Sequence, residues 1–288
     1  MAKKRAQYRR YTRSRAGNAV YFFILFLAGA FTIVPLVYCV VTSFKPIDEL
    51  LIFPPRFFVN RPTLSNYRAL PSLLSKLRVP ITRYMFNSLF ISFLGTFLHI
   101  VVASLAAFSL SKSNMWGRKT YFWIIQVMLL YNGVTLGVPQ YFIFSKMNII
   151  DTYWVYILPA IPSAVGCFLM KQFMDTAVPD VLMEAARIDG AGVLRIYWSI
   201  IMPMLKPAWM TMMLFSFQSM WTIVPSGTIF SEQLKTLPQV MGQITAGGIA
   251  RAGSAMAVTV ILMIPPIVVF LISQSNVLET MSSSGIKE

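Results

Sequence analysis

The chain has 288 residues, of which 56% are hydrophobic and only 12% are charged, and its formal net charge is +15. A soluble domain of this length carries about twice that charged fraction, so the composition excludes an ordinary soluble protein and indicates an integral membrane protein. The basic residues are spread over segments that flank apolar runs. This distribution is typical of contact with anionic lipid headgroups and argues against a nucleic-acid-binding face. The two cysteines, Cys39 and Cys167, are too few for a disulfide scaffold.

Six apolar runs are long enough to cross a bilayer as helices, because a hydrocarbon core of about 30 Å needs about 20 residues. In chain order these runs are Val20–Thr42, Met85–Leu110, Tyr121–Phe144, Tyr153–Phe173, Ala208–Ile229 and Ala255–Ser273. Glycine and proline in the third and fifth runs indicate kinks or unwound turns. The sequence therefore predicts an all-α integral membrane fold, with six transmembrane helices packed as one domain.

Basic residues orient this predicted domain. The membrane domain is expected at 19–276, with a basic tail at 1–18 and a short tail at 277–288. When the N-terminal tail is placed inside, most of the 25 basic residues fall on the cytoplasmic side, and the positive-inside rule predicts that both termini are cytoplasmic. The 43–84 loop is then extracytoplasmic although it is rich in basic residues, and the 176–206 loop is cytoplasmic.

A polar island between the fourth and fifth runs, EAARIDGAGVLRIYWSIIMP at 184–203, stands out in this apolar chain. Pro179 and Asp180 predict the start of a helix, and Gly190 predicts its end at a position that often needs a positive φ. A second helix is expected at Val193–Ile201. Leu182, Ala185, Ala186 and Ile188 can form a small apolar stripe. Such a helix–turn–helix can lie in the groove of a partner protein or rest as an amphipathic helix at the membrane interface.

The motifs of common chemistries are absent from the sequence. There is no G-x-x-x-x-G-K-[ST] phosphate-binding loop, and His99 is the only histidine, which is too few for a triad or a histidine-rich metal site. His99 is either a packed residue that bonds a neighbouring helix or a residue that lines a pathway. The predicted spans contain no Asp, Glu or Arg, which disfavours an ion-coupled carrier or a membrane enzyme. Backbone carbonyls can still hold sodium, so a secondary carrier stays open.

The island resembles the cytoplasmic loop of permease subunits of bacterial ABC importers, which has the form E-A-A-x3-G-x9-I-x-L-P. The matching positions, with Met202 in place of the leucine, are Glu184, Ala185, Ala186, Gly190, Ile200 and Pro203. Other segments resemble the carbohydrate-importer branch, which is related to the second maltose-type permease: Ser43-Phe44-Lys45-Pro46, Asn66-Tyr67, Asn87-Ser88, Gly117-Arg118-Lys119 and Lys171-Gln172-Phe173. The resemblance covers most of the chain from about residue 20 onward.

The resemblance implies a permease of the bacterial cell membrane that moves a sugar or oligosaccharide by alternating access. The implied partners are a second, homologous permease, two ATPase subunits that bind ATP and Mg, and an extracytoplasmic binding protein. The chain itself is then no enzyme and needs no cofactor. The residues implied to couple it to the ATPase, as a coupling helix, are Glu184, Ala185, Ala186, Arg187, Asp189 and Gly190.

Residues that contact the cargo are harder to choose. Sugar sites combine aromatic faces with hydrogen-bonding side chains. Candidates within the spans are Tyr131, Asn132, Gln140, Gln218, Ser219 and Trp221, together with Ser216. Gln218 and Trp221 are three residues apart, so both can face one cavity. The alternative for each is a bond to a neighbouring helix. An importer for a peptide, an amino acid or another small solute also stays open.

Overall fold

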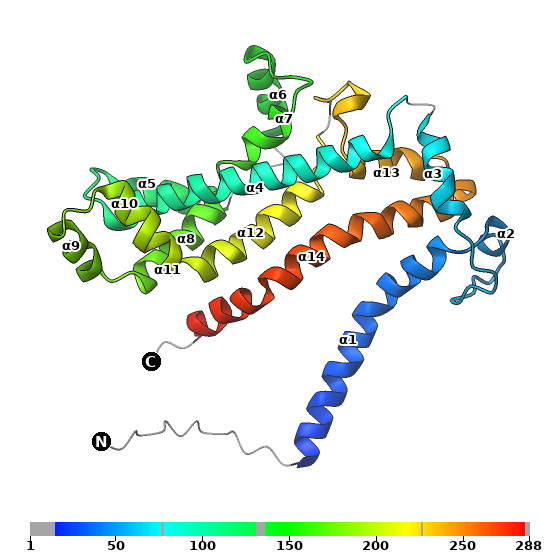
Figure 1. The fold of residues 1–288 in the computed structure, drawn as a ribbon, viewed down its shortest axis with the longest axis horizontal. Helices are drawn as coiled ribbons and strands as arrows, with labels where there is room; N and C mark the ends of the chain where they lie inside the picture. Colours follow the sequence, from blue (N-terminus) through cyan, green and yellow to red (C-terminus); the bar gives the residue numbers. More distant parts are fainter. Residues whose placement is uncertain (1–14, 76–77, 131–135, 226, 286–288) are drawn as a thin grey trace.

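The structure is a computed structural model that describes residues 15–75, 78–130, 136–225 and 227–285. Within these ranges the chain forms helices joined by turns, as the apolar composition predicts (Figure 1). Three helices are long and apolar enough to cross a membrane alone: α1 (Arg15–Ser43), α4 (Ile81–Lys112) and α14 (Ala252–Gly285).

Two further spans are bent pairs of helices. In the first pair, α7 (Trp154–Ile157) and η2 (Leu158–Ala160) meet α8 (Ala164–Ala177) at 41°. In the second, the helical stretch Val193–Met204 meets α12 (Lys206–Trp221) at 79°. The third predicted run, Tyr121–Phe144, coincides with α5 (Arg118–Met128) and α6 (Gly137–Lys146) and includes residues outside the described ranges. The described helices thus supply three to five spans, and the count of six stays a prediction.

Several helix ends differ from the predicted ends. The helix α4 begins at Ile81 instead of Met85, and α12 ends at Trp221 instead of Ile229. Pro225 and the positive φ of Gly227 follow α12, and both residue types end helices. At the other end of the chain, α14 continues to Gly285, past the predicted tail boundary at 277. The segment 267–284 contains no Gly or Pro to stop it.

The helix α4 is the centre of the membrane body. It packs on α8 and α12, and α12 packs in turn on α14. These helices run along one another in Figure 1, whereas α1 meets the body near α2 (Ile47–Leu50) and then diverges from it. Most of α1 is exposed and apolar, including Phe22, Phe26 and Phe31. Its length and composition suit a surface covered by lipid or by another membrane protein.

Different elements gather at the two ends of α4. Near Lys112 lies the 180–204 loop, which is built from α9 (Asp180–Ile188), α10 (Val193–Ile196), the π-helical turn η3 (Tyr197–Ile201) and α11 (Met202–Met204). Near Ile81 lie α3 (Ser65–Ser75), η4 (Glu232–Leu234), α13 (Leu237–Thr245) and η5 (Ile249–Arg251). Figure 1 shows α9 and α13 at opposite ends of the body.

Candidate functional site

The 180–204 loop has the helix–turn–helix shape that the polar island predicts. The helix α9 ends at Ile188, and Gly190 follows with a φ of +78°, in the left-handed region that glycine enters without steric cost. The turn closes through a hydrogen bond of 2.9 Å from the Ala191 N–H to the Ala186 carbonyl. The chain then re-enters helix at Val193. Glycine at 190 therefore fixes the direction in which α10 leaves α9.

One face of α9 is turned away from the body. The side chains of Glu184, Ala185, Arg187 and Asp189 are exposed, as is Gly190. Larger apolar side chains surround them, and Ile188, at 85% exposure, is the most open of these. The other exposed apolar residues of the loop are Val181, Leu182, Val193, Leu194 and Trp198. This mixture of apolar and charged groups is suited to contact with another protein.

Ala186 lies on the opposite face and corrects the expected stripe. The side chain of Ala186 is only 8% exposed. Like Met183, it packs against buried residues of α4, α8 and α12. We call the buried residues that join the 180–204 loop to these three helices the methionine-rich cluster. The helical period places 183 and 186 on one side and 184, 185 and 188 on others. Of the six residues implied to couple the chain to an ATPase, five are therefore open to a partner and Ala186 faces inward.

A lysine at the end of α4 holds the start of the loop. The Lys112 side chain is 6% exposed, and its Nζ donates to the Val178 carbonyl at 2.6 Å and to Asp180 Oδ1 at 2.7 Å. The hydrogen bond and charge of Lys112 lower the pKa of Asp180. Asp180 is the first residue of α9, as the sequence predicts, but Pro179 is the N-cap and no side chain caps the helix. The carboxylate bonds Lys112 instead.

A second contact holds the far arm of the loop. The Tyr197 hydroxyl lies 2.6 Å from Ser104 Oγ of α4, and both side chains are fully buried. Four methionines of the methionine-rich cluster surround this region: Met170, Met174, Met183 and Met212. Neither Lys112 nor Tyr197 was chosen from the sequence. The sequence does contain a signal for Lys112. It is the single lysine at the end of an apolar run, and the twelve residues before it carry no charge.

The residues predicted to contact cargo do not form one group. Tyr131 and Asn132 lie outside the described residues. Gln140 is half-buried on α6, and Gln218 and Ser219 are exposed on α12. Ser219 lines a pocket of about 410 Å³ together with Ser216 and His99.

Trp221 does not share a cavity with Gln218, contrary to the expectation from their spacing. It is 4% exposed, stacks on Phe217 and donates from Nε1 to the Leu262 carbonyl of α14 at 2.9 Å. The indole is apolar over most of its surface, so packing between α12 and α14 satisfies both the ring and its single donor. Trp221 therefore joins two helices, which is the alternative weighed for each of these residues.

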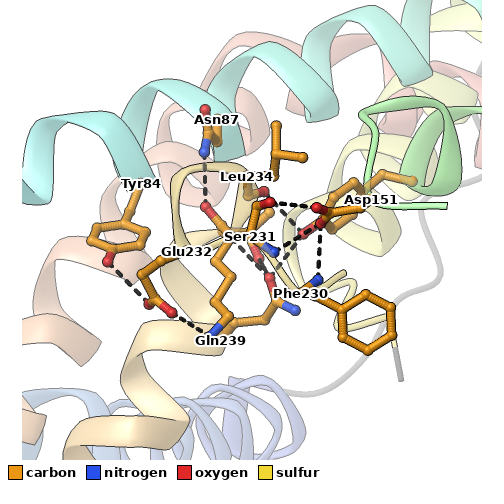
Figure 2. Close-up of polar contacts among 11 residues, drawn as sticks. Tyr84, Asn87, Asp151, Phe230, Ser231, Glu232, Leu234 and Gln239 are labelled. Atoms are coloured by element: carbon orange, nitrogen blue, oxygen red, sulfur yellow. Dashed lines mark hydrogen bonds and ion pairs between the residues drawn. The ribbon is translucent and has the colours of Figure 1, made fainter. Parts of the chain in front are cut away.

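A polar network lies at the opposite end of α4, where the sequence predicts an extracytoplasmic surface. We call it the 228–239 network, because this segment folds back onto α4 and onto the turn before α7 (Figure 2). Asn87 Nδ2 donates to the carbonyls of Gln233 at 2.8 Å and Lys235 at 2.9 Å, and Ser88 Oγ accepts from the Leu237 N–H at 2.8 Å. The Tyr84 hydroxyl donates to Glu232 at 3.1 Å.

Asp151 fixes the other side of the 228–239 network. Its carboxylate accepts from the Phe230 N–H at 2.9 Å, the Ser231 N–H at 2.8 Å and the Ser231 hydroxyl (Figure 2). Desolvation raises the pKa of Asp151, but the bonds from Ser231 and Phe230 outweigh it and leave the pKa below its ordinary value. The sequence analysis noted Asn87-Ser88 only because the pair resembles the carbohydrate-importer branch. In the structure both side chains bond backbone groups of the 228–239 network.

The chain is similar in sequence to a family of membrane transport proteins. The family model of the binding-protein-dependent transport system inner membrane component matches residues 99–282. The sn-glycerol-3-phosphate transport system permease protein UgpE of Yersinia pestis is 30% identical over 201 residues, which are 68% of this chain and 70% of that protein. The sulfoquinovosyl glycerol transport system permease protein SmoH of Agrobacterium fabrum is 28% identical over 268 residues, 92% of this chain and 91% of that protein.

A third relative and a solved structure agree with these matches. The polygalacturonan/rhamnogalacturonan transport system permease protein YtcP of Bacillus subtilis is 25% identical over 274 residues, 89% of this chain and 93% of that protein. The crystal structure of a bacterial ABC transporter involved in the import of the acidic polysaccharide alginate contains a chain of the same fold, with a TM-score of 0.73, 22% identity, and coverage of 91% of this chain and 98% of that chain. With the family model matched over residues 99–282, this chain belongs to the binding-protein-dependent transport system inner membrane components.

Proposed function

We propose that the chain is a membrane subunit of an ATP-driven importer and that it translocates a sugar or oligosaccharide delivered by an extracytoplasmic binding protein. Family membership supports the permease role, and the cargoes for which the relatives are named, which are rich in hydroxyl groups, support a carbohydrate. ATP and Mg are bound by two partner ATPase subunits, and a second, homologous permease completes the pathway. The N-terminus, the C-terminus and the 180–204 loop face the cytoplasm of a bacterial cell.

The observation that carries the proposal is the exposed 184–190 surface on a loop that is anchored from behind. Glu184, Arg187 and Asp189 can form charge-assisted bonds to a partner, while Ile188 supplies apolar contact. Lys112 and Tyr197 tie the same loop to α4. A partner that moves α9 therefore moves the membrane body with it. Closure of an ATPase dimer shifts the balance between inward- and outward-facing states only through such a differential contact.

Two substitutions test this role in the complete transporter. Glu184→Lys reverses the charge of the exposed face, and Gly190→Trp adds bulk at a positive φ, where side chains other than Asn are strained. Both are expected to loosen the ATPase and to abolish ATP-dependent uptake into proteoliposomes while membrane insertion is kept. Matched controls are Asp48→Lys, an exposed charge reversal on α2 at the other end of the body, and Gly190→Asn, which tolerates the left-handed region. Normal transport by both test variants would refute the proposal.

The cargo is tested on the binding protein of the same transporter. A thermal-shift panel should compare neutral mono- and oligosaccharides, uronate oligosaccharides, glycerol 3-phosphate, amino acids and short peptides. Stabilisation by a carbohydrate or polyol is expected. Stabilisation by peptides or amino acids alone would replace the carbohydrate part of the proposal. Uptake by this chain in liposomes without any ATPase would instead establish a secondary carrier.

A further inference from the structure

The segment that follows α1 and α2 folds into a closed loop at 51–59. Its base is held by Glu49 of α2, a carboxylate that is buried. Glu49 accepts hydrogen bonds from the Asn60 N–H at 3.1 Å and from the Arg61 N–H at 2.9 Å. These bonds join the two ends of the loop, and bonds to an ionised acceptor are about twice as strong as neutral ones. The 51–59 loop therefore has a defined shape.

A buried lysine holds this loop against α1. The Nζ of Lys45 donates to the Arg56 carbonyl, on the far side of the loop. The same Nζ lies 5.3 Å from the centre of the Tyr38 ring, and the centre of the Phe57 ring lies 5.6 Å from that of Tyr38. Tyr38 precedes Ser43, the end of α1, by five residues, which is about 8 Å along a helix. The loop thus folds back along the span and does not project away from it.

The tip of the 51–59 loop is apolar and open. Phe53 is 92% exposed and Phe58 is 74% exposed. The residues between and before them are exposed as well: Leu51, Ile52, Pro54, Pro55 and Arg56. Single exposed apolar side chains are ordinary, but a continuous apolar run on a closed loop marks contact with a membrane or with a protein.

The position of the tip favours a lipid surface as its partner. The apolar side chains of α1 are exposed along the span, and the contact of Phe57 with Tyr38 makes the tip a continuation of that surface. Aromatic rings are enriched where hydrocarbon meets the headgroups. Arg56 is the only charged residue of 51–59, and a guanidinium at this level can bond lipid phosphates. Figure 1 shows α2 at the edge of the molecule, beside the end of α1 and apart from α4.

We propose that the 51–59 loop is a lipid anchor, which inserts Phe53 and Phe58 between the headgroups and the acyl chains of the bilayer while Arg56 bonds a lipid phosphate. Glu49 and Lys45 are positioning residues, since Glu49 closes the loop and Lys45 holds it against α1. This contact goes beyond the proposed function and depends neither on the cargo nor on the ATPase, so the two can fail separately.

Fluorescence quenching tests the insertion. In the complete transporter, Phe53→Cys is placed in a background of Cys39→Ala and Cys167→Ala and labelled with the dye NBD, in vesicles of phosphatidylethanolamine and phosphatidylglycerol. Lipids that carry a doxyl group at the top or at the end of an acyl chain should place the dye about 5–10 Å into the boundary. Aqueous iodide should quench it only weakly. The matched control is Ser65→Cys, an exposed serine at the start of α3, which iodide should quench more strongly than lipid does.

Stronger quenching by iodide than by doxyl lipid at position 53 would overturn the lipid anchor. If the same labelled transporter still takes up sugar with ATP, the anchor fails and the importer stands. If the dye inserts but Glu184→Lys transports normally, the importer proposal fails and the anchor stands.

Photo-crosslinking separates a lipid partner from a protein partner. Phe53 is replaced by p-benzoylphenylalanine in the complete transporter, and the membranes are irradiated in the presence of the binding protein. Adducts to phospholipid, identified by mass spectrometry of the peptide that contains position 53, are expected to predominate. Adducts chiefly to the second permease or to the binding protein would assign the tip to a protein interface and overturn the anchor.

Two neighbouring substitutions test the closure of the loop. Glu49→Ala removes the buried acceptor of two backbone N–H groups, whereas Asp48→Ala removes an exposed partner of Arg61. Glu49→Ala is expected to lower the lipid quenching at position 53 to less than about half, because its loss leaves both donors unpaired. Asp48→Ala should leave the quenching unchanged, since exposed ion pairs contribute little. Equal quenching in the two variants would show that Glu49 does not position the tip.

Discussion

The two ends of α4 are held by different chemistry. At the Ile81 end, the 228–239 network uses directional hydrogen bonds, many of them to backbone groups. At the Lys112 end, the 180–204 loop rests on the methionine-rich cluster, and among the described residues two polar contacts join it to α4, Lys112 with Asp180 and Ser104 with Tyr197. Methionine has three rotatable bonds and adapts to small displacements, whereas a set of hydrogen bonds tolerates little change in register. The comparison predicts that the Ile81 end stays fixed and that the Lys112 end can follow the partner that the proposed function assigns to it.

The largest loss of stability is expected from a substitution at the fixed end, in the 228–239 network. At a fully buried position, Asn87→Leu removes the donors to the carbonyls of Gln233 and Lys235 and also the acceptor of the Tyr153 hydroxyl. The stability should fall by about 2–4 kcal/mol, because each buried group without a partner costs about 1–3 kcal/mol. Unfolding in mixed micelles measures the change. Gln172→Leu, an exposed amide of α8, is the control and should stay near wild type. Equal stability of the two variants would contradict a locked end.

The next largest effect is expected at the Lys112 end, where a substitution should increase local opening of the 180–204 loop without unfolding the membrane body. Lys112→Met removes the bonds to Val178 and Asp180 but keeps an apolar stem of similar length. The buried Lys112 makes a charge-assisted bond to the Val178 carbonyl, so amide exchange over 178–190 should accelerate roughly 10- to 100-fold while exchange in α12 is unchanged. The exposed Lys119→Met serves as the control. If exchange rises equally over all of α4, the lysine supports the body and not the loop.

A smaller effect sharpens the comparison within the loop. Tyr197→Phe removes one hydroxyl, and Ser104 Oγ keeps its bond of 2.6 Å to the Ile100 carbonyl, so no buried group is left without a partner. The expected loss of stability is about 1 kcal/mol, measured as for Asn87. Ser273→Ala, which removes a buried hydroxyl bonded within α14, provides the reference. A loss as large as that of Asn87→Leu would show that the loop end is also locked by polar contacts.

The smallest effect depends on pH. Because the folded-state pKa of Asp151 is lowered, its carboxylate stabilises the protein above the unfolded-state pKa of about 4, and this stabilisation is lost as the pH falls through the folded-state pKa. Asp151→Asn should therefore cost about 0.5–1 kcal/mol at pH 7, a small value since the site is open to solvent, and less than that near pH 3. Parallel unfolding of wild type and variant at the two pH values measures this. A difference that persists unchanged at pH 3 would contradict the assignment.

Local signals predicted the parts of the molecule that local forces build. The polar island predicted α9, the positive φ of Gly190 and the restart at Val193, because caps, glycine and charge placement act within a few residues. The apolar runs predicted α1, most of α4 and the first part of α14 for the same reason. Five of the six predicted coupling residues lie on an open surface, and the inward turn of Ala186 depends on where the body sits.

Contacts between distant segments were not predictable from the sequence alone. The direction of Trp221 depends on Leu262 in another helix, and the role of Asn87 depends on carbonyls about 150 residues away. The break at 161–163 was also missed, because the apolar run Tyr153–Phe173 continues through Pro159 and Pro162 without a loss of hydropathy. His99 is unusual as the only histidine of the sequence, but its bond to the Ala160 carbonyl and its close packing against Gly166 become visible only in the structure.

The 79° angle between the Val193–Met204 stretch and α12 sets the direction of any motion that passes through it. When two rigid helices are joined nearly at right angles, a displacement along the axis of the first is nearly perpendicular to the axis of the second. Displacement of the 180–204 loop along its own axis therefore reaches α12 mainly as tilt and hardly at all as sliding. Because Ser216 and Ser219 lie on α12, a tilt of this helix would widen or narrow one wall of the pocket while α4 keeps its register.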